Sequence, residues 1–211
     1  VKAMLGEDNY PDFIVIDGAE GGTGAAPVEF MDNVGMPLVD GFLLVHNTLV
    51  GAGIRDKIKI GVSGKLISAF DIARMLAIGA DWCNSARGFM FAVGCIQSRS
   101  CHTNKCPTGV ATQDPYRQRA LDVPDKAQRV YNFHKNTLKA MAAIVGAVGL
   151  DHPKDLRPYH IARRMDDGSI KLLSKFYYFT EKGVLLDLSA RAEIFNQMWV
   201  MANPDSFLAD N

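Results

Sequence analysis

The chain has 211 residues, 48% of them hydrophobic, and its 23 basic and 23 acidic side chains give a formal net charge of zero. This composition is typical of one globular domain, alone or with an appendage, and balanced charge argues against nucleic acid or an acidic membrane surface as a partner. The sequence has neither a secretion signal nor an apolar run near the roughly 20 residues of a membrane span, so we expect a cytoplasmic protein outside the membrane.

The first predicted βα unit begins with a short apolar run at residues 12–16 that is rich in β-branched and aromatic side chains. The run stops at Asp17-Gly18, which predicts a strand followed by a turn. A glycine-dense loop follows at residues 19–27. Apolar residues then recur at helical spacing and end at two glycines: Phe42, Val45, Leu49 and Val50, followed by Gly51 and Gly53.

The same order of elements recurs twice. Residues 57–62 predict a strand, Ser63-Gly64-Lys65 a loop, and residues 68–78 a helix with Ser68 as N-cap and Gly79 as C-cap. A third strand is expected at residues 80–85, followed by a loop at Ala86-Arg87-Gly88. Strands that alternate with helices of this length favour parallel pairing, and therefore an α/β sheet or barrel.

A long helix is expected to open near Pro124 and to end before Gly149 and Pro153. Its predicted inward face consists of apolar residues at helical spacing: Ala127, Val130, Met141, Ile144, Val145 and Val148. We therefore assign residues 1–149 to the α/β domain.

The character of the sequence changes after residue 150. Charged turns such as Asp166-Asp167-Gly168 separate short apolar runs, including residues 175–180 and 184–188. We interpret residues 150–211 as a C-terminal appendage with a small hairpin and a last helix near residues 190–201.

Three cysteines, Cys95, Cys101 and Cys106, lie close together in a segment rich in small polar residues. Thiolates bind soft metals, and three of them can supply one protein ligand to each iron of a three-iron cluster. Two other interpretations remain open, a zinc site completed by His102 and a disulfide with one free thiol. Cys83, on the third predicted strand, is expected to be buried packing.

The run from Gly94 to Gln113 closely resembles the cluster segment of glutamate synthases, in which three cysteines at this spacing hold a 3Fe-4S cluster. Residues 17–27 resemble the flavin-domain loop of the same family, and residues 85–92 resemble its single-domain, FMN-binding branch. The resemblance extends over about residues 12–149. It implies an α/β fold that is the carboxyl-terminal part of a (β/α)8 TIM-type barrel, with Cys95, Cys101 and Cys106 as metal ligands.

The same resemblance implies that glycine-rich loops hold FMN. Glycine lets the backbone approach a ligand closely, and eight-stranded barrels frequently hold phosphate in the loops after their last two strands. Lys65 and Arg87 add positive charge there, although each equally fits a solvated surface residue. The predicted FMN-binding residues are Gly21, Gly22, Thr23, Gly24, Ser63, Gly64, Lys65, Ala86, Arg87 and Gly88.

The implied activity is that of an oxidoreductase in which FMN reduces 2-iminoglutarate, formed from 2-oxoglutarate and ammonia, to glutamate while the cluster relays electrons. Ferredoxin, or a reduced pyridine nucleotide acting through another subunit, is the expected electron donor. One alternative is a metal-binding or assembly module with no activity of its own, and a weaker one is a phosphate-binding barrel enzyme unrelated to flavin.

Only three of a barrel's eight strands are visible, so the catalytic residues are expected outside the chain. Three strands also leave two unpaired edges. We expect the amino-terminal half of the barrel, or a second copy of the chain, to pair along residues 12–16. Position 1 is Val rather than Met, which also points to a piece of a longer polypeptide.

Overall fold

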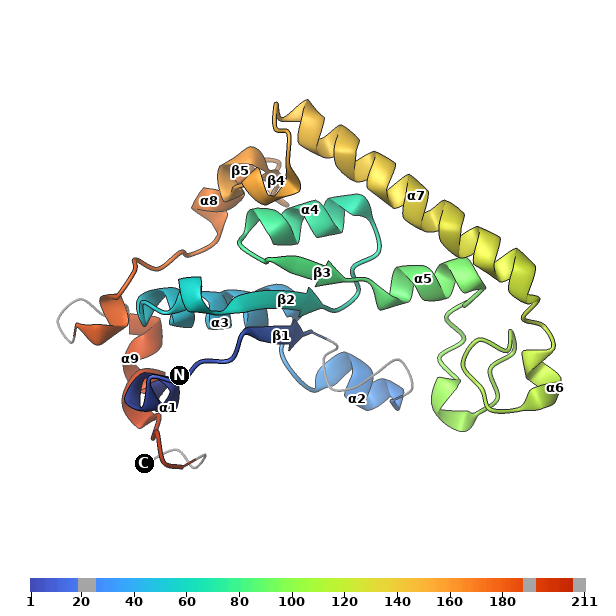
Figure 1. The fold of residues 1–211 in the computed structure, drawn as a ribbon, viewed down its shortest axis with the longest axis horizontal. Coiled ribbons are helices and arrows are strands. Elements are labelled where there is room, and N and C mark those ends of the chain that lie inside the picture. The colour runs from blue at the N-terminus through green and yellow to red at the C-terminus, as the bar shows by residue number, and fades with distance from the viewer. Residues whose placement is uncertain (19–25, 188–192, 207–211) are drawn as a thin grey trace.

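The protein is described by a computed structural model that covers residues 1–18, 26–187 and 193–206 (Figure 1). Its centre is a three-stranded parallel sheet in the order β1-β2-β3, formed by Phe13–Asp17, Lys59–Ser63 and Trp82–Asn84. This confirms the predicted α/β class with parallel strands. Asp17 lies opposite Ser63, and Ser63 lies opposite Asn84, so the carboxyl ends of all three strands are level.

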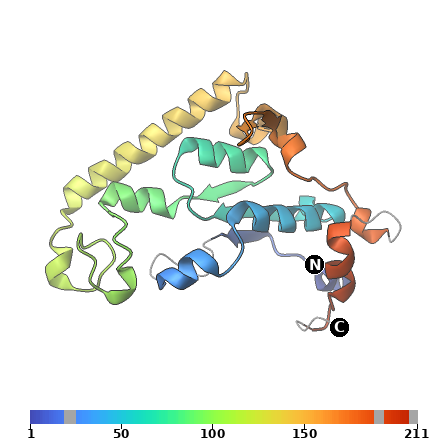
Figure 2. The same ribbon diagram turned by 180° about the vertical axis from the view of Figure 1, so that it is seen from behind.

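Two crossover helices cover one face of the sheet. Helix α3 (Leu38–Gly51) joins β1 to β2, and α4 (Ala69–Ala77) joins β2 to β3. Figures 1 and 2 show α3 behind the sheet in one view and in front of it in the other. Ile60 and Val62 of β2 are fully buried on this face. They form the centre of the hydrophobic core with apolar residues of both helices.

The predicted helix after β2 is confirmed together with its N-cap Ser68, whereas its C-cap is Ile78 and the predicted C-cap, Gly79, is the next residue. The Ser68 hydroxyl accepts a hydrogen bond from the backbone N–H of Asp71 at 3.2 Å, and the Asp71 carboxylate accepts one from the backbone N–H of Ser68 at 3.0 Å. This capping box satisfies two amides that the helix leaves without partners. Gly79 has φ +117°, the left-handed conformation expected just past the last helical turn.

Several short elements differ from the expectation. Lys57 lies in a 3-10 turn, η1 (Arg55–Lys57), and not in a strand. Two further helices have no counterpart among the predicted elements, α1 (Lys2–Glu7) and α2 (Val28–Asn33). They are each only six residues long, too short for an apolar periodicity to stand out.

The expected loop at Ala86-Arg87-Gly88 is wrong, because these residues form the first turn of α5 (Ala86–Val93). Gly88 lies within this short helix and Gly94 follows it, and because glycine is a poor helix former the sequence predicted a loop here. A buried contact supplies the stability. A side chain at Gly88 would lie 2.7 Å from the ring of Phe133, so the glycine lets α5 pack closely on the long helix.

The long helix α7 (Val123–Ala147) begins and ends as expected, with Pro124 in its first turn and Gly149 at φ +74° beyond its end. Met141 and Val145 are buried, and Val130 and Ile144 half-buried, as predicted. The assignment of Ala127 and Val148 to the inward face is wrong, since both are exposed. Phe133 and Thr137 continue the inward stripe instead, because the first half of α7 packs on α5.

The segment after residue 150 contains a small hairpin, as expected. Strands β4 (Ala162–Arg164) and β5 (Ile170–Leu172) pair antiparallel around the turn at Asp166-Asp167-Gly168. The apolar runs at 175–180 and 184–188 are not strands within the part described. The other elements from η2 onward are η2 (Cys101–Thr103), α6 (Pro115–Gln118), η3 (Pro153–Asp155), η4 (Pro158–His160), α8 (Leu173–Phe176), η5 (Val184–Leu186) and α9 (Glu193–Met201).

This C-terminal segment packs directly on the α/β core. Leu156, Leu173 and Leu185 are at most 1% exposed and belong to the same hydrophobic cluster as the sheet. Buried Asn47 on α3 donates from Nδ2 to the Tyr178 carbonyl at 2.9 Å and accepts from the Thr180 N–H at 3.1 Å. One side chain thus satisfies two backbone groups of a strand-like segment far along the sequence.

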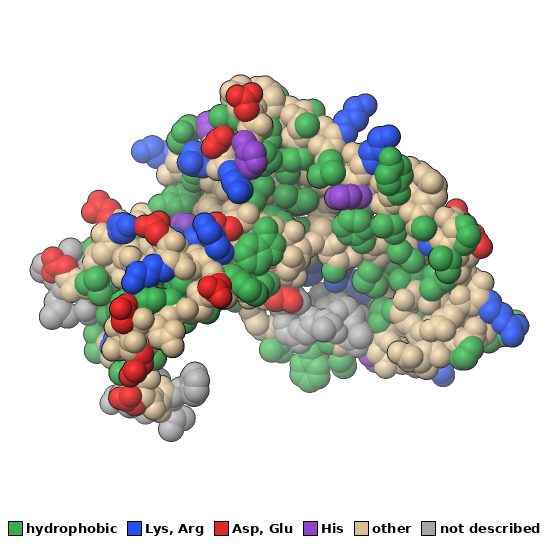
Figure 3. Space-filling model, viewed as in Figure 1, with side chains coloured by type: hydrophobic (Ala, Val, Ile, Leu, Met, Phe, Trp, Pro, Cys, Tyr) green, Lys and Arg blue, Asp and Glu red, His purple; other side chains and the backbone are tan. Residues whose placement is uncertain are grey.

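The other face of the sheet has no helix over it in the part of the chain described. Phe13 and Val15 are 58% and 42% exposed on this face. Trp82 lies across Gly61, where an added Cβ would be 2.3 Å from the indole, and its ring meets Phe13 edge to face. Figure 3, which looks onto this side, shows hydrophobic side chains over the sheet. One covered and one apolar, open face is the arrangement of a segment of a barrel wall, with which this fold is compatible.

None of the described helices combines the length and the hydropathy that crossing a bilayer requires.

Candidate cofactor site

The first part of the site is a close backbone approach at the carboxyl ends of β1 and β2. The N–H of Gly18 donates to the Ser63 carbonyl at 2.7 Å. Gly64 has φ +141°, and a Cβ there would lie 3.1 Å from the Gly18 backbone. Lys65 is also left-handed, at φ +52°. These two conformations turn the chain sharply just after β2, so that backbone and not side chain lines this edge.

The second part of the site is the amino terminus of α5. The Ser85 hydroxyl donates to the Leu66 carbonyl at 2.7 Å, which fastens the loop after β2 to the start of α5. The Ser85 side chain makes no capping hydrogen bond to α5. The first amides of a helix have no partner within it and carry partial positive charge, which attracts an anion. The loop after β2 and the start of α5 therefore lie at the same end of the sheet, where the strands finish. This end holds both predicted groups, Ser63-Gly64-Lys65 and Ala86-Arg87-Gly88.

The predicted FMN-binding residues are placed unevenly. Arg87 is half-buried in the first turn of α5. Gly88 is buried against Phe133. Because it has no side chain, α5 can pack closely on α7, and a ligand could also approach the backbone there. The predicted contacts at Gly21, Gly22, Thr23 and Gly24 lie outside the described residues.

The cysteine segment follows α5 directly. Gly94 ends the helix at φ +118°, and the N–H of Cys95 donates to the Met90 carbonyl at 2.9 Å. Cys95 and Cys101 are half-buried and Cys106 is buried. All four cysteines of the chain are free thiols, so the disulfide interpretation is wrong for this structure. In Figure 1 the segment forms a compact lobe between α5 and α6.

Asn104 organises this lobe. It adopts the left-handed conformation at φ 62°, as do Gln97 and Arg99 at φ 54° each. The Asn104 side-chain Oδ1 accepts from the Gln113 N–H at 2.6 Å and from the Thr112 hydroxyl at 3.0 Å. Asn104 thereby closes the loop between Cys101 and Cys106 onto the strand-like segment that follows. Asparagine tolerates positive φ better than most residues. An asparagine between two closely spaced cysteines is therefore the sequence feature that could have indicated a tight turn here.

Cys106 is surrounded by hydrogen-bond donors. It is 4% exposed. Burial raises its pKa, but hydrogen bonds with the Thr108 hydroxyl and the backbone N–H groups of Ala111, Thr108 and Val110 outweigh burial and lower the pKa to about 7. Donors converging on one sulfur stabilise a thiolate, which is the form that binds a metal.

The metal-binding geometry itself is not assembled. Within the described residues, no three His, Cys, Asp or Glu side chains are arranged to hold a metal ion. This applies equally to a cluster on Cys95, Cys101 and Cys106 and to zinc with His102. The donor chemistry fits a thiolate-bound metal, whereas convergence of the three sulfurs stays a prediction.

Cys83 differs from the other cysteines, as its position on β3 indicated. Its sulfur faces α4, 4.0 Å from the Ile72 carbonyl. Burial raises the pKa of Cys83 to about 12, so its thiol stays protonated and serves as packing.

Comparison with known proteins shows which proteins this chain is similar to. The family model described as "Conserved region in glutamate synthase" matches residues 2–151. The glutamate synthase large subunit-like protein YerD of Bacillus subtilis is 46% identical over 79% of this chain and 32% of its own length. An archaeal glutamate synthase [NADPH] of Archaeoglobus fulgidus is 36% identical over 69% of this chain and 29% of its own. The ferredoxin-dependent glutamate synthase of Pyropia yezoensis is 38% identical over 66% of this chain and 9% of its own.

The chain therefore spans about a third or less of the length of these relatives. The matched region covers the sheet, the carboxyl edge, the cysteine lobe and α7. On this match, the chain belongs to the glutamate synthase family.

Proposed function

We propose that this chain forms the carboxyl-terminal part of a glutamate synthase-like oxidoreductase that uses FMN and a 3Fe-4S cluster to reduce 2-iminoglutarate, formed from 2-oxoglutarate and ammonia, to glutamate. One observation carries the proposal. A single short helix, α5, starts where the strands of the sheet end and finishes at Val93, two residues before Cys95. The predicted phosphate site and the predicted cluster are thus joined by one rigid element of eight residues.

The carboxyl edge fits the phosphate end of FMN. Gly64 keeps the backbone free of side chains, and the first-turn amides of α5 offer N–H donors to an anion. Lys65 and Arg87 would add positive charge. When bound, FMN supplies hydride chemistry and the cluster supplies one-electron transfer. This chain's own part is to bind and orient the two groups.

The cysteine lobe fits a soft metal cluster in its chemistry. Three free thiols lie within one loop, and the donors around Cys106 resemble the hydrogen bonds that tune the sulfurs of iron-sulfur sites. Metal sites are commonly completed only when the metal draws its ligands together. We therefore assign Cys95, Cys101 and Cys106 as the ligands.

The open sheet face supports a barrel completed by other polypeptide. Phe13 and Val15 expose apolar surface on a strand that, among the described residues, pairs with β2 alone. Such an edge invites another strand. We propose that the amino-terminal half of the barrel, or a second copy of this chain, pairs with β1. The electron donor, ferredoxin or a reduced pyridine nucleotide used by a further subunit, would act on that assembly.

The same open face favours one alternative, a metal-binding or assembly module without activity of its own. Absorption spectra of the anaerobically purified protein separate the two. Flavin bands together with cluster absorption support the oxidoreductase. Brown cluster absorption that persists without flavin, even after addition of FMN, supports the module. A colourless protein with stoichiometric zinc contradicts both the FMN and the cluster assignments.

A further inference from the structure

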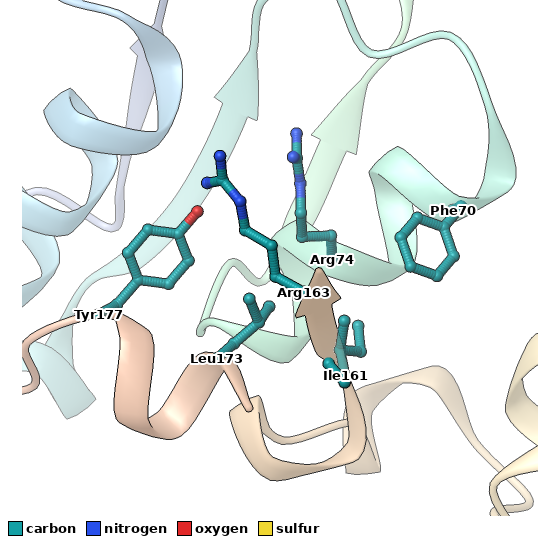
Figure 4. Close-up of a pocket in the computed structure, with 7 residues that line it drawn as sticks. Phe70, Arg74, Ile161, Arg163, Leu173 and Tyr177 are labelled. Carbon is teal, nitrogen blue, oxygen red and sulfur yellow. The ribbon is translucent and has the colours of Figure 1, made fainter. Parts of the chain in front are cut away.

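A pocket of about 380 Å³ lies between α4 and the C-terminal hairpin (Figure 4). Phe70 and Arg74 of α4 form one wall. The opposite wall comes from the hairpin, α8 and the residue after α8, with Ile161, Ala162, Arg163, Leu173 and Tyr177. Figure 1 shows the hairpin and α8 away from the loops at the carboxyl ends of the strands, so the pocket is separate from the cofactor site.

Two arginines share this pocket, and the charge of Asp71 partly offsets that of Arg74. Among the described residues, neither Arg74 nor Arg163 forms an ion pair. Asp71, one turn before Arg74, accepts hydrogen bonds from Ser68 and Ile67 instead. The Nε of Arg74 is buried and has no hydrogen-bond partner. This nitrogen is closed to solvent, so an anion in the pocket would be bound by the terminal guanidinium nitrogens.

One of the two guanidinium groups has an aromatic stacking partner. Arg163 stacks over the ring of Phe176, 4.6 Å from its centroid. Figure 4 shows the side chains of Arg163 and Arg74 extending in the same direction, with the Tyr177 hydroxyl turned toward the Arg163 side. Apart from the Tyr177 hydroxyl, the remaining lining consists of apolar side chains, among which Leu173 and Ile161 are 1% and 6% exposed. The pocket therefore combines a cationic end with an apolar wall.

We propose that this pocket binds a small organic anion, with an oxyanion head between Arg74 and Arg163 and an apolar body against Ile161 and Leu173. A phosphate monoester and a carboxylate share the required chemistry, since guanidinium forks bind either in a bidentate way. The site goes beyond the family's matched region, which ends at residue 151, because all of its residues except Phe70 and Arg74 come later. It does not depend on the flavin or the cluster.

Isothermal titration calorimetry on the full chain tests the proposal, with phenyl phosphate and benzoate as probes and inorganic phosphate as the probe without an apolar body. We expect phenyl phosphate or benzoate to bind more tightly than inorganic phosphate, and the better of the two identifies the head group. Arg163→Gln should weaken that binding about tenfold or more, because hydrogen bonds to a charged group contribute about 1.5–3 kcal/mol.

Arg164→Gln is the matched control. Arg164 is the next residue on β4, and successive side chains of a strand point to opposite faces, so its loss should leave binding unchanged. Both positions are exposed, and circular dichroism melting curves would verify that both variants fold. Binding that survives Arg163→Gln, equal losses in the two variants, or no binding of either aromatic probe at millimolar concentration would each overturn the proposal.

Discussion

At the scale of single residues, His46 is the clearest case of a side chain whose charge state the fold decides. Its Nδ1 accepts a hydrogen bond from Arg55 Nε at 3.2 Å, while the Arg55 Nη2 also donates to Asp81 at 2.7 Å. Burial, and then the nearby Arg55 charge, lowers the pKa of His46 from 6.5 to about 4. The imidazole is therefore neutral in the folded protein at neutral pH.

This depressed pKa predicts a loss of stability in acid. The unfolded chain takes up a proton on His46 near pH 6.5, whereas the folded chain resists until about pH 4. The free energy of unfolding should therefore fall between these values, by up to about 3 kcal/mol. Urea unfolding at several pH values would measure it in the wild type and in His46→Gln. If the two proteins show the same pH dependence, the proposed cause is wrong.

Asn104 carries the second residue-scale prediction. Its Oδ1 only accepts hydrogen bonds, from Thr112 and Gln113, so Asn104→Asp should keep the cysteine lobe closed. Asn104→Leu removes both bonds and places a bulky side chain at positive φ, which should cost about 2–3 kcal/mol. Hydrogen exchange of the Gln113 amide would report the opening directly. Equal protection in both variants would contradict this role for Asn104.

At the scale of elements, the contact between α3 and the chain at residues 178–180 depends on a single polar side chain. Asn47→Ala leaves the Tyr178 carbonyl and the Thr180 N–H without partners, and each loss costs about 1–3 kcal/mol. We expect destabilisation of about 3 kcal/mol in denaturant titrations. Asn33→Ala is the matched control, because Asn33 donates to Glu29 at an exposed helix end and its loss should cost under about 0.5 kcal/mol. Similar values for the two variants would contradict the account.

Elements whose signals are local could be predicted from the sequence. The helix α4 has its capping Ser68 as predicted, and its left-handed Gly79 lies one residue beyond the C-cap Ile78. The helix α5 could not be predicted, because Gly88 is favourable there only when Phe133 of α7 lies across it. Asn47 was equally invisible, since its two partners lie more than a hundred residues away.

In the candidate site, too, only the features with a local signal could be predicted from the sequence. Cysteine spacing located the lobe, and strand ends located the carboxyl edge. The conformation of the lobe depends on the contacts of Asn104 with residues 112 and 113, which spacing does not encode. Convergence of the three sulfurs stays a prediction, because metal ligands are commonly drawn together only by the metal, which sequence spacing alone does not describe.

At the scale of the whole molecule, helices cover only one face of the sheet in the part of the chain described. Phe13, Val15 and Trp82 form an apolar surface on the face opposite to α3 and α4, and β1 lies at the edge of the sheet. Apolar surface on an edge strand is normally covered in a stable protein. Another strand paired with β1 would therefore cover surface that this fold leaves exposed.

This arrangement predicts that the chain associates through the open face when it is produced without other polypeptides. Sedimentation velocity should show dimers or larger species, and Val15→Lys should shift them toward monomer, since a charge on that face opposes burial. Val123→Lys, at an exposed position in the first turn of α7, should leave association unchanged. A folded wild-type monomer that stays monodisperse as its concentration is raised would contradict the prediction.

The central claim is that three thiols of one loop hold a single iron-sulfur cluster, and electron paramagnetic resonance with iron and sulfide analysis of anaerobically purified protein tests it most directly. We predict iron and sulfide in a ratio of three to four and a paramagnetic oxidised cluster in the wild type. The signal should persist in Cys83→Ala, which removes a half-buried, protonated thiol, and vanish in Cys101→Ala. An iron-free wild type, or a cluster that survives Cys101→Ala, would contradict the claim.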